Sequence, residues 1–124
     1  MAQQTANQKQ EEYSIQTADP VWLREEADRV IRFFAERLRD VGIVKEVRFT
    51  YEVHGVTGWV IAEPPDDDYR SEDPIMEAVG DALDYQKVAL FDFRIINLKR
   101  ITKGNPLKYY VPPEAETLWK RKDA

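Results

Sequence analysis

The sequence contains no cysteine and a single histidine among its 124 residues. The lack of cysteine excludes disulfide bonds, thiolate nucleophiles, iron–sulfur clusters and zinc sites that use Cys ligands. A Ser-His-Asp arrangement would have His54 as its only available base. A chain without cysteine is also typical of a reducing compartment, so we expect a cytoplasmic protein.

Long apolar runs are absent as well. No stretch approaches the ~18 consecutive apolar residues that cross a bilayer. Residues 1–12 are polar and Gln-rich, without the apolar centre of a secretory signal. We therefore expect no membrane association, and we expect residues 1–14 to form a disordered polar tail.

The remaining composition is sufficient for one domain, because 43% of the residues are hydrophobic and 11% are aromatic. Asp19-Pro20 predicts the start of a helix, since Asp caps free N–H groups and Pro tolerates the first helical position. The helix is expected to end at Gly42. Its predicted buried stripe recurs at helical spacing and consists of Leu23, Ala27, Val30, Ile31, Phe34, Leu38 and Val41.

The middle of the chain predicts a hairpin and a second helix. Alternating residues 46–53 indicate a strand with one buried face, residues 54–58 a turn, and residues 59–62 the returning strand. Asp73-Pro74 repeats the helix-start signal. The apolar stripe of this second helix is expected to contain Ile75, Met76, Val79 and Leu83.

Residues 88–101 predict a long strand, and a slip in its apolar alternation indicates a bulge or a central strand covered on both faces. Residues 107–111 predict a short last strand and residues 113–122 a short terminal helix. We expect residues 15–111 to form a single domain and residues 112–124 a C-terminal extension.

The predicted element order is therefore α-β-β-α-β-β-(α). It favours an α+β fold in which two helices pack on one face of a mostly antiparallel sheet of three to four strands. The third strand fits beside the first, making all neighbours antiparallel, or beside the second through a right-handed crossover. The sequence leaves both placements open.

The net charge of −5 is unevenly distributed. Residues 94–124 carry eight Lys or Arg and three acids, a net +5, whereas residues 63–84 carry nine acids and one Arg, a net −8. Solvated loops explain such segregation most simply. The sharper hypothesis is that the basic segment lies against the acidic one, within the chain or across a dimer. The charged surface that we single out consists of Asp66, Asp67, Asp68, Lys99, Arg100 and Lys103.

Signals for catalysis are sparse. His54 offers a general base, and the acidic residues 63–73 offer oxygen ligands for Mg²⁺ or Ca²⁺. The acidic run lacks the spaced ligands of an EF-hand, and the chain has no phosphate-binding glycine loop or nucleophile elbow. We therefore expect no catalytic residue, metal site or cofactor. A metal-assisted enzyme that uses the acidic loop and His54 remains an alternative.

A second alternative is binding of single-stranded nucleic acid. Cations and aromatic residues interleave between Lys99 and Arg121, a combination suited to phosphates and stacked bases. The net charge of −5 opposes this function. Gly55-Val56-Thr57-Gly58 matches the GXXG pattern of KH domains, but it joins two predicted strands, so we interpret it as a hairpin turn.

Apolar residues outside the predicted core favour association with a protein. Trp22 and Phe33 lie eleven residues apart, nearly in line on the flank of the first helix. Further aromatic residues follow near the C-terminus. Our leading hypothesis is a small non-enzymatic protein-interaction or regulatory module that forms a homodimer. Its expected partner-binding residues are Trp22, Phe33, Tyr109, Tyr110 and Trp119.

Residues 73–104 resemble one half of the regulatory domain of isopropylmalate synthase. In that domain a helix is followed by a strand reading roughly L-x-D-Y-x-[VI], and here the strand reads Leu90-Phe91-Asp92-Phe93-Arg94-Ile95. The resemblance covers about a quarter of the chain and implies, as a third alternative, a small-ligand-sensing domain. This chain has neither a duplicated unit nor a catalytic barrel, so no ligand-binding residue follows from the resemblance.

Overall fold

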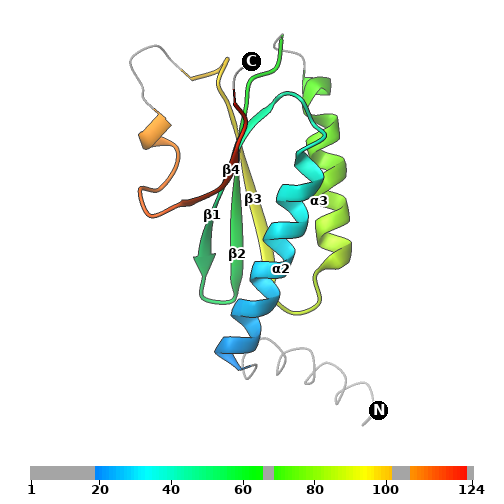
Figure 1. The fold of residues 1–124 in the computed structure, drawn as a ribbon, viewed down its shortest axis with the longest axis vertical. Helices are drawn as coiled ribbons and strands as arrows, with labels where there is room; N and C mark the ends of the chain where they lie inside the picture. The colour runs from blue at the N-terminus through cyan, green and yellow to red at the C-terminus, as the bar shows by residue number, and fades with distance from the viewer. Residues whose placement is uncertain (1–18, 66–68, 102–106, 123–124) are drawn as a thin grey trace, which may run out of the picture.

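The computed structural model describes residues 19–65, 69–101 and 107–122. Two helices cover one face of a four-stranded sheet, as Figure 1 shows. No helix in these described ranges has the length and apolar character needed to cross a membrane. In chain order the elements are α2 (Pro20–Leu38), β1 (Val44–Glu52), β2 (Gly55–Ala62), η1 (Tyr69–Glu72), α3 (Asp73–Tyr85), β3 (Leu90–Asn97), η2 (Leu107–Tyr109) and β4 (Glu116–Lys120).

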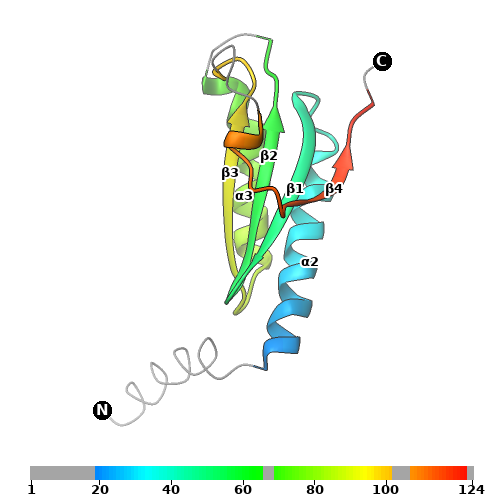
Figure 2. The same cartoon turned by 90° about the vertical axis from the view of Figure 1, so that its left-hand side faces the viewer.

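The strand order is β3-β2-β1-β4, and the fold is α+β as the sequence predicts. β1 pairs in antiparallel orientation with both β2 and β4, whereas β3 runs parallel to β2. α3 forms the crossover between the two parallel strands. Of the two placements left open by the sequence, the structure therefore has the third strand beside the second. In Figure 2, β3 and β4 lie at opposite edges of the sheet.

Helix α2 begins where its sequence predicts. The Asp19 side chain accepts a hydrogen bond of 2.8 Å from the Val21 N–H, and Pro20 occupies the first turn. The helix ends at Leu38, before the predicted stop at Gly42. Its buried face forms the centre of the core with the helix-facing sides of the strands, and the fully buried residues include Phe34, Ile31, Leu38, Val47 and Val60.

The hairpin turn is shorter than predicted. Only Val53 and His54 form it, and the segment Gly55–Gly58 belongs to β2, so its interpretation as a turn is wrong. The reason is close packing. A Cβ added at Gly58 would lie 3.0 Å from the Ile31 side chain, and one added at Gly55 would lie 1.8 Å from the Leu90 carbonyl oxygen. These glycines serve close approach of neighbouring elements rather than chain reversal.

Helix α3 spans Asp73–Tyr85, and its N-cap is Glu72 rather than the predicted Asp73. Two of the predicted core residues, Met76 and Leu83, are 47% and 45% exposed. They lie about 90° from the buried face at 100° per residue. That face is made instead of Ile75, Ala78, Val79 and Ala82.

Strand β3 covers only part of the predicted segment 88–101 and is an edge strand, not a central one. Its register with β2 is unbroken from Leu90 to Asn97, so the expected bulge is absent from this pair. Ile95 and Ile96 are both half-buried although they point to opposite faces, which explains the slip in the pattern.

The C-terminal predictions are wrong in type. Residues 107–109 form the short 3₁₀ helix η2 instead of a strand, and residues 116–120 form β4 instead of a helix. β4 exists because the outer edge of β1 is free to pair with it, with Glu46 opposite Lys120 and Val47 opposite Trp119. Part of the expected C-terminal extension therefore belongs to the sheet.

Candidate functional site

Two of the five predicted partner-binding residues, Phe33 and Trp119, line one groove of about 490 Å³. They are far apart in sequence and come from α2 and β4, while Tyr85 joins them from the end of α3. We call this feature the aromatic groove. Its lining residues are Arg32, Phe33, Ala35, Glu36, Arg39, Tyr85, Leu118 and Trp119.

Phe33 forms one wall of the aromatic groove. Its ring stacks on Tyr85 with centroids 4.6 Å apart and an interplanar angle of 9°. A stacked pair of this kind stabilises the relative position of the two rings. Phe33 is half-buried, and Tyr85 is 43% exposed. The groove therefore has an ordered aromatic wall where α2 meets α3.

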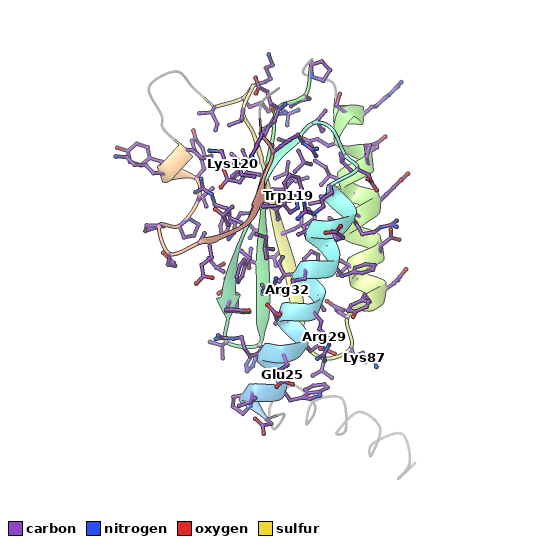
Figure 3. The ribbon with its side chains drawn as sticks, viewed as in Figure 1. Glu25, Arg29, Arg32, Lys87, Trp119 and Lys120 are labelled. Carbon is purple, nitrogen blue, oxygen red and sulfur yellow. The ribbon has the colours of Figure 1, made fainter. Side chains whose placement is uncertain are left out.

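Trp119 lines the aromatic groove from β4 and attaches this strand to α2. Its indole Nε1 donates a hydrogen bond of 2.8 Å to the Ala35 carbonyl oxygen. The guanidinium groups of Arg39 and Arg121 lie 5.5 and 5.1 Å from its ring. Figure 3 shows Trp119 beside α2, with Arg32 on the same helix. The indole is thus held in place by contacts from α2 and from the residue that follows β4.

Charged residues form the rim of the aromatic groove. Arg32 pairs with Asp28 at 2.9 Å and Arg39 with Glu36 at 2.7 Å. Burial raises the pKa of Asp28, but hydrogen bonds from Arg32 and Tyr51 outweigh burial and leave this pKa below its ordinary value. The hydrogen bond with Asp28 in turn raises the pKa of Arg32. An apolar groove with guanidinium groups on its rim is suited to an apolar or aromatic side chain flanked by acidic residues.

The other predicted partner-binding residues lie elsewhere. Trp22 is in the first turn of α2, 39% exposed, and does not line the aromatic groove. Tyr109 is 70% exposed and Tyr110 is 37% exposed. Figure 1 and Figure 2 both place η2 on the side of the sheet away from the helices. The five residues therefore do not form one surface.

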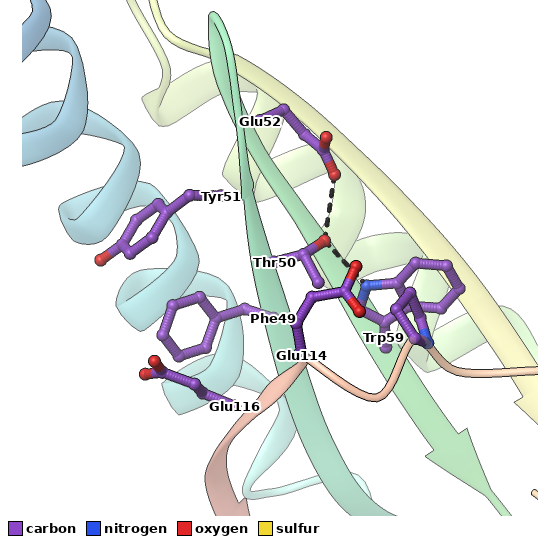
Figure 4. A pocket seen from close by; sticks show the side chains of 8 residues that line it. Phe49, Thr50, Tyr51, Glu52, Trp59, Glu114 and Glu116 are labelled. Carbon is purple, nitrogen blue, oxygen red and sulfur yellow. Dashed lines mark hydrogen bonds between the residues drawn. The ribbon is translucent and has the colours of Figure 1, made fainter. Parts of the chain in front are cut away.

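The open face of the sheet carries a small polar pocket of about 160 Å³, seen in Figure 4. Trp59 Nε1 donates to Thr50 Oγ1 at 3.1 Å, and this hydroxyl donates to Glu52 at 3.0 Å. Glu114 and Glu116 complete the acidic side of the pocket. Within the described ranges, no group of three or more His, Cys, Asp or Glu side chains is placed to hold a metal ion.

His54 lies in the hairpin turn and is exposed. It lines a shallow groove of about 550 Å³ on the open face, together with Thr57, Asp92 and Arg94.

The β-sheet register also places Trp59 between Arg48 on one neighbouring strand and Arg94 on the other. The Glu46 carboxylate pairs with Arg48, and Asp92 lies 3.4 Å from Arg94.

Among the described residues, the basic and acidic segments are in contact through Arg100 and Glu72. Arg100 lies 3.7 Å from Glu72, and the Asn97 side chain lies 3.5 Å from the same carboxylate. Lys99 is exposed. The remaining members of the predicted charged surface lie outside the described residues, namely Asp66, Asp67, Asp68 and Lys103.

Two buried carboxylates were not singled out by the sequence. Glu26 is 3% exposed and accepts hydrogen bonds from the N–H groups of Val88 and Ala89. Glu46 is 5% exposed and accepts from Arg48 and Thr117. The available signal was position, since Glu26 lies directly beside Ala27 of the apolar stripe and Glu46 opens the alternating strand. Both positions hold distant segments together.

No family model, curated protein or solved structure matches this chain. The helix–strand resemblance of residues 73–104 is therefore not extended by any of these comparisons, and the candidate function depends on the geometry alone.

Proposed function

We propose that this chain is a non-enzymatic protein-interaction module that functions as a homodimer and binds a partner segment in the aromatic groove. The observation that carries the proposal is the convergence of Phe33, Tyr85 and Trp119 from three separate elements. Such aromatic clusters, accessible at one edge and fixed at the other, are typical of the central part of a protein interface.

The rim defines the chemistry of the segment that fits. Arg32 and Glu36 of α2 and Arg39, the residue that follows α2, line the groove together with Phe33. Both guanidinium groups pair with carboxylates of their own helix, and such exposed pairs are weak enough to exchange partners. We expect an apolar or aromatic anchor residue followed or preceded by Asp or Glu.

Affinity capture from cells that produce the chain naturally, quantified by mass spectrometry, tests the groove. Phe33→Ala removes one aromatic wall, and Val21→Ala is the matched control because Val21 is 65% exposed on the same helix but lies outside the groove. We expect a specific partner to be lost with the first variant and retained with the second, with unchanged circular dichroism for both. Equal retention by both variants would exclude the groove as the binding surface.

A second candidate, binding of single-stranded nucleic acid, is supported by the row Arg48–Trp59–Arg94 across three strands of the open face. An aromatic ring between two cations provides base stacking and phosphate contacts together. Fluorescence anisotropy with a labelled oligonucleotide at low salt would then show binding that weakens with salt and with Trp59→Ala. A flat titration at low salt removes this candidate.

A further inference from the structure

β3 lies at one edge of the sheet. The sheet order places β2 on one side of β3 and no strand on the other within the described residues. β3 is eight residues long and regular in register, and it carries mainly apolar residues. A long, regular, apolar edge is unusual for a monomer because its free N–H and C=O groups are able to pair with another strand.

The sequence of β3 is complementary to itself in antiparallel orientation. Around Phe93 as a centre, Asp92 on one side matches Arg94 on the other. The next positions outward match Phe91 with Ile95, and then Leu90 with Ile96. A second copy of β3 related by a two-fold axis at Phe93 would therefore meet opposite charges at Asp92 and Arg94, and apolar residues at the other positions.

The backbone presents the correct groups for this register. The N–H of Leu98 donates to the carbonyl oxygen of Ala62 at the end of β2, at 2.8 Å. The N–H of Leu90 donates, also at 2.8 Å, to the carbonyl oxygen of His54, the residue that precedes β2. Because backbone N–H and C=O groups alternate in direction along a strand, the even-numbered residues of β3 direct theirs toward β2. The odd-numbered residues between them direct theirs outward, away from the sheet. Phe93 would then exchange two hydrogen bonds with Phe93 of the second copy.

Side chains occupy two of these outward N–H groups in the single chain. Gln86 Oε1 accepts from Phe91 at 3.1 Å, and Asp92 Oδ1 accepts from Phe93 at 2.8 Å. Both acceptors are on rotatable side chains. On pairing, the two N–H groups transfer to carbonyl oxygens of the second copy. The Asp92 carboxylate, 57% exposed, becomes free to bind Arg94 of that copy.

Helix α3 supplies a second, independent feature at the same edge. One flank of α3 faces α2, through the Asp81–Arg37 ion pair and the Tyr85–Phe33 stack. Met76 and Leu83 lie on the opposite flank, about half exposed and about two turns apart. Since α3 covers the β3 side of the sheet in Figure 2, this apolar flank faces the region beyond the β3 edge.

We infer that the homodimer forms by antiparallel pairing of β3 with β3 of a second copy, centred on Phe93, with the α3 flanks of the two copies packed beside the junction. The sheet then continues through both chains as eight strands with all four helices on one face. This inference depends on the homodimer of the proposed function and gives that homodimer an interface separate from the aromatic groove.

Charge reversal tests the register. The full chain should have a solution mass twice the 14.5 kDa of one chain in sedimentation equilibrium. Asp92→Arg alone and Arg94→Asp alone each place like charges opposite one another, twice per dimer, and should raise the dimer Kd by about tenfold or more. The double variant Asp92→Arg/Arg94→Asp restores both pairs and should return the Kd to within about threefold of wild type. Singles that match wild type, or a double no better than the singles, overturn the inference.

Disulfide trapping gives a second measurement, since the natural chain has no cysteine and an introduced one is able to pair only with its copy in the second chain. Opposite residues of a hydrogen-bonded antiparallel pair have Cα atoms about 5.5 Å apart, a distance that a disulfide spans. Phe93→Cys should therefore give a covalent dimer under mild oxidation. Leu90→Cys, on the same strand, should not, because the two copies of residue 90 would lie about 20 Å apart. Equal cross-linking of both variants contradicts the register.

The aromatic groove provides the distinguishing control. If dimerisation is lost with Phe33→Ala while all β3 variants remain dimeric, the dimer forms through the groove and only the β3 inference fails. If the wild-type chain is a monomer at tens of micromolar, both the β3 inference and the homodimer of the proposed function fail. Partner capture through Phe33 remains a separate measurement in either case.

Discussion

The carboxylate of Glu26 on α2 accepts a hydrogen bond of 2.8 Å from the N–H of Val88 and a second one from the adjacent Ala89. A single buried side chain of the first helix thus holds the segment that leads into β3. The contact joins residues more than sixty positions apart and determines where the edge strand starts. It makes Glu26 a structural residue rather than part of an exposed flank.

Replacement of Glu26 should therefore be costly. Glu26→Ala leaves two N–H groups without their acceptor, and we expect the free energy of unfolding to fall by about 2–4 kcal/mol. Glu26→Gln keeps an acceptor oxygen and should lose less than half as much. Urea denaturation measures both variants, with the exposed neighbour Glu25→Ala as control. A loss for Glu26→Ala no larger than for the control would contradict the assigned role.

Gly58 should not tolerate a methyl group. A Cβ there would lie 3.0 Å from the Ile31 side chain and 3.1 Å from the Phe34 ring, so these buried side chains would have to shift by a few tenths of an ångström. We expect Gly58→Ala to lower the unfolding free energy by about 1–3 kcal/mol. Gly42→Ala is the matched control, because an added Cβ has no atom within 4 Å, and its stability should change by less than about 0.5 kcal/mol. Thermal melts of the two variants decide the comparison.

The free energy of unfolding should depend on pH in the acidic range because of Glu46. Burial raises the pKa of Glu46, but Arg48 and the Thr117 hydroxyl outweigh burial, so this pKa lies below the ordinary 4.5. A lowered folded-state pKa stabilises the fold above the unfolded pKa, and this contribution disappears as pH falls through the folded pKa.

Unfolding of wild type and Glu46→Gln measured from pH 7 down to pH 3 tests this dependence. The variant should be less stable at pH 7, and the difference should narrow below about pH 4.5. Thr117→Val, which removes one donor and keeps the carboxylate, should give a smaller loss at pH 7. A difference that stays constant over the whole range would show that Glu46 is not responsible.

Arg121, which follows β4, should stabilise the segment between α2 and β1 through direct hydrogen bonds. Its guanidinium donates to the carbonyl oxygens of Val44 at 2.9 Å, Arg39 at 3.0 Å and Val41 at 3.2 Å. The planar fork of Arg holds its N–H donors in a fixed, spread arrangement, whereas the ammonium of Lys is compact and lies on a flexible stem. We expect Arg121→Lys to lose about 1 kcal/mol and Arg121→Ala about 2 kcal/mol, with Lys122→Ala as an exposed control. Equal stability of the Lys and Arg forms would rule out the multiple-acceptor role.

Features with local causes were predictable from the sequence. Asp19 and Pro20 define the start of α2 through contacts within one turn, and the apolar spacing defines its buried face. Features with distant causes were not. The sequence alone predicts Gly58 as a turn residue, because its contact with α2 is made by residues more than twenty positions away. Residues 116–120 form a strand because they pair with the edge of β1.

The candidate site follows the same division. The surplus aromatic residues were recognisable one by one, and Phe33 and Trp119 belong to one groove. Their grouping was not predictable because Tyr85, which stacks on Phe33, comes from α3. The apolar pattern of α3 predicts a buried face that differs from the one in the structure. Met76 and Leu83, which the same pattern predicts as buried, are exposed for the same reason.

The two-residue turn at Val53 and His54 has a consequence for the order of folding. β1 and β2 meet across this turn and form a local hairpin on a microsecond timescale. Both other pairings require long loops to close, β3 through α3 and β4 through most of the chain. We expect the hairpin with α2 to be the folding nucleus, so that the amide protons of Thr50 and Thr57, which lie opposite each other in the β1–β2 pair, become protected from exchange before those of β4 in a pulse-labelling experiment.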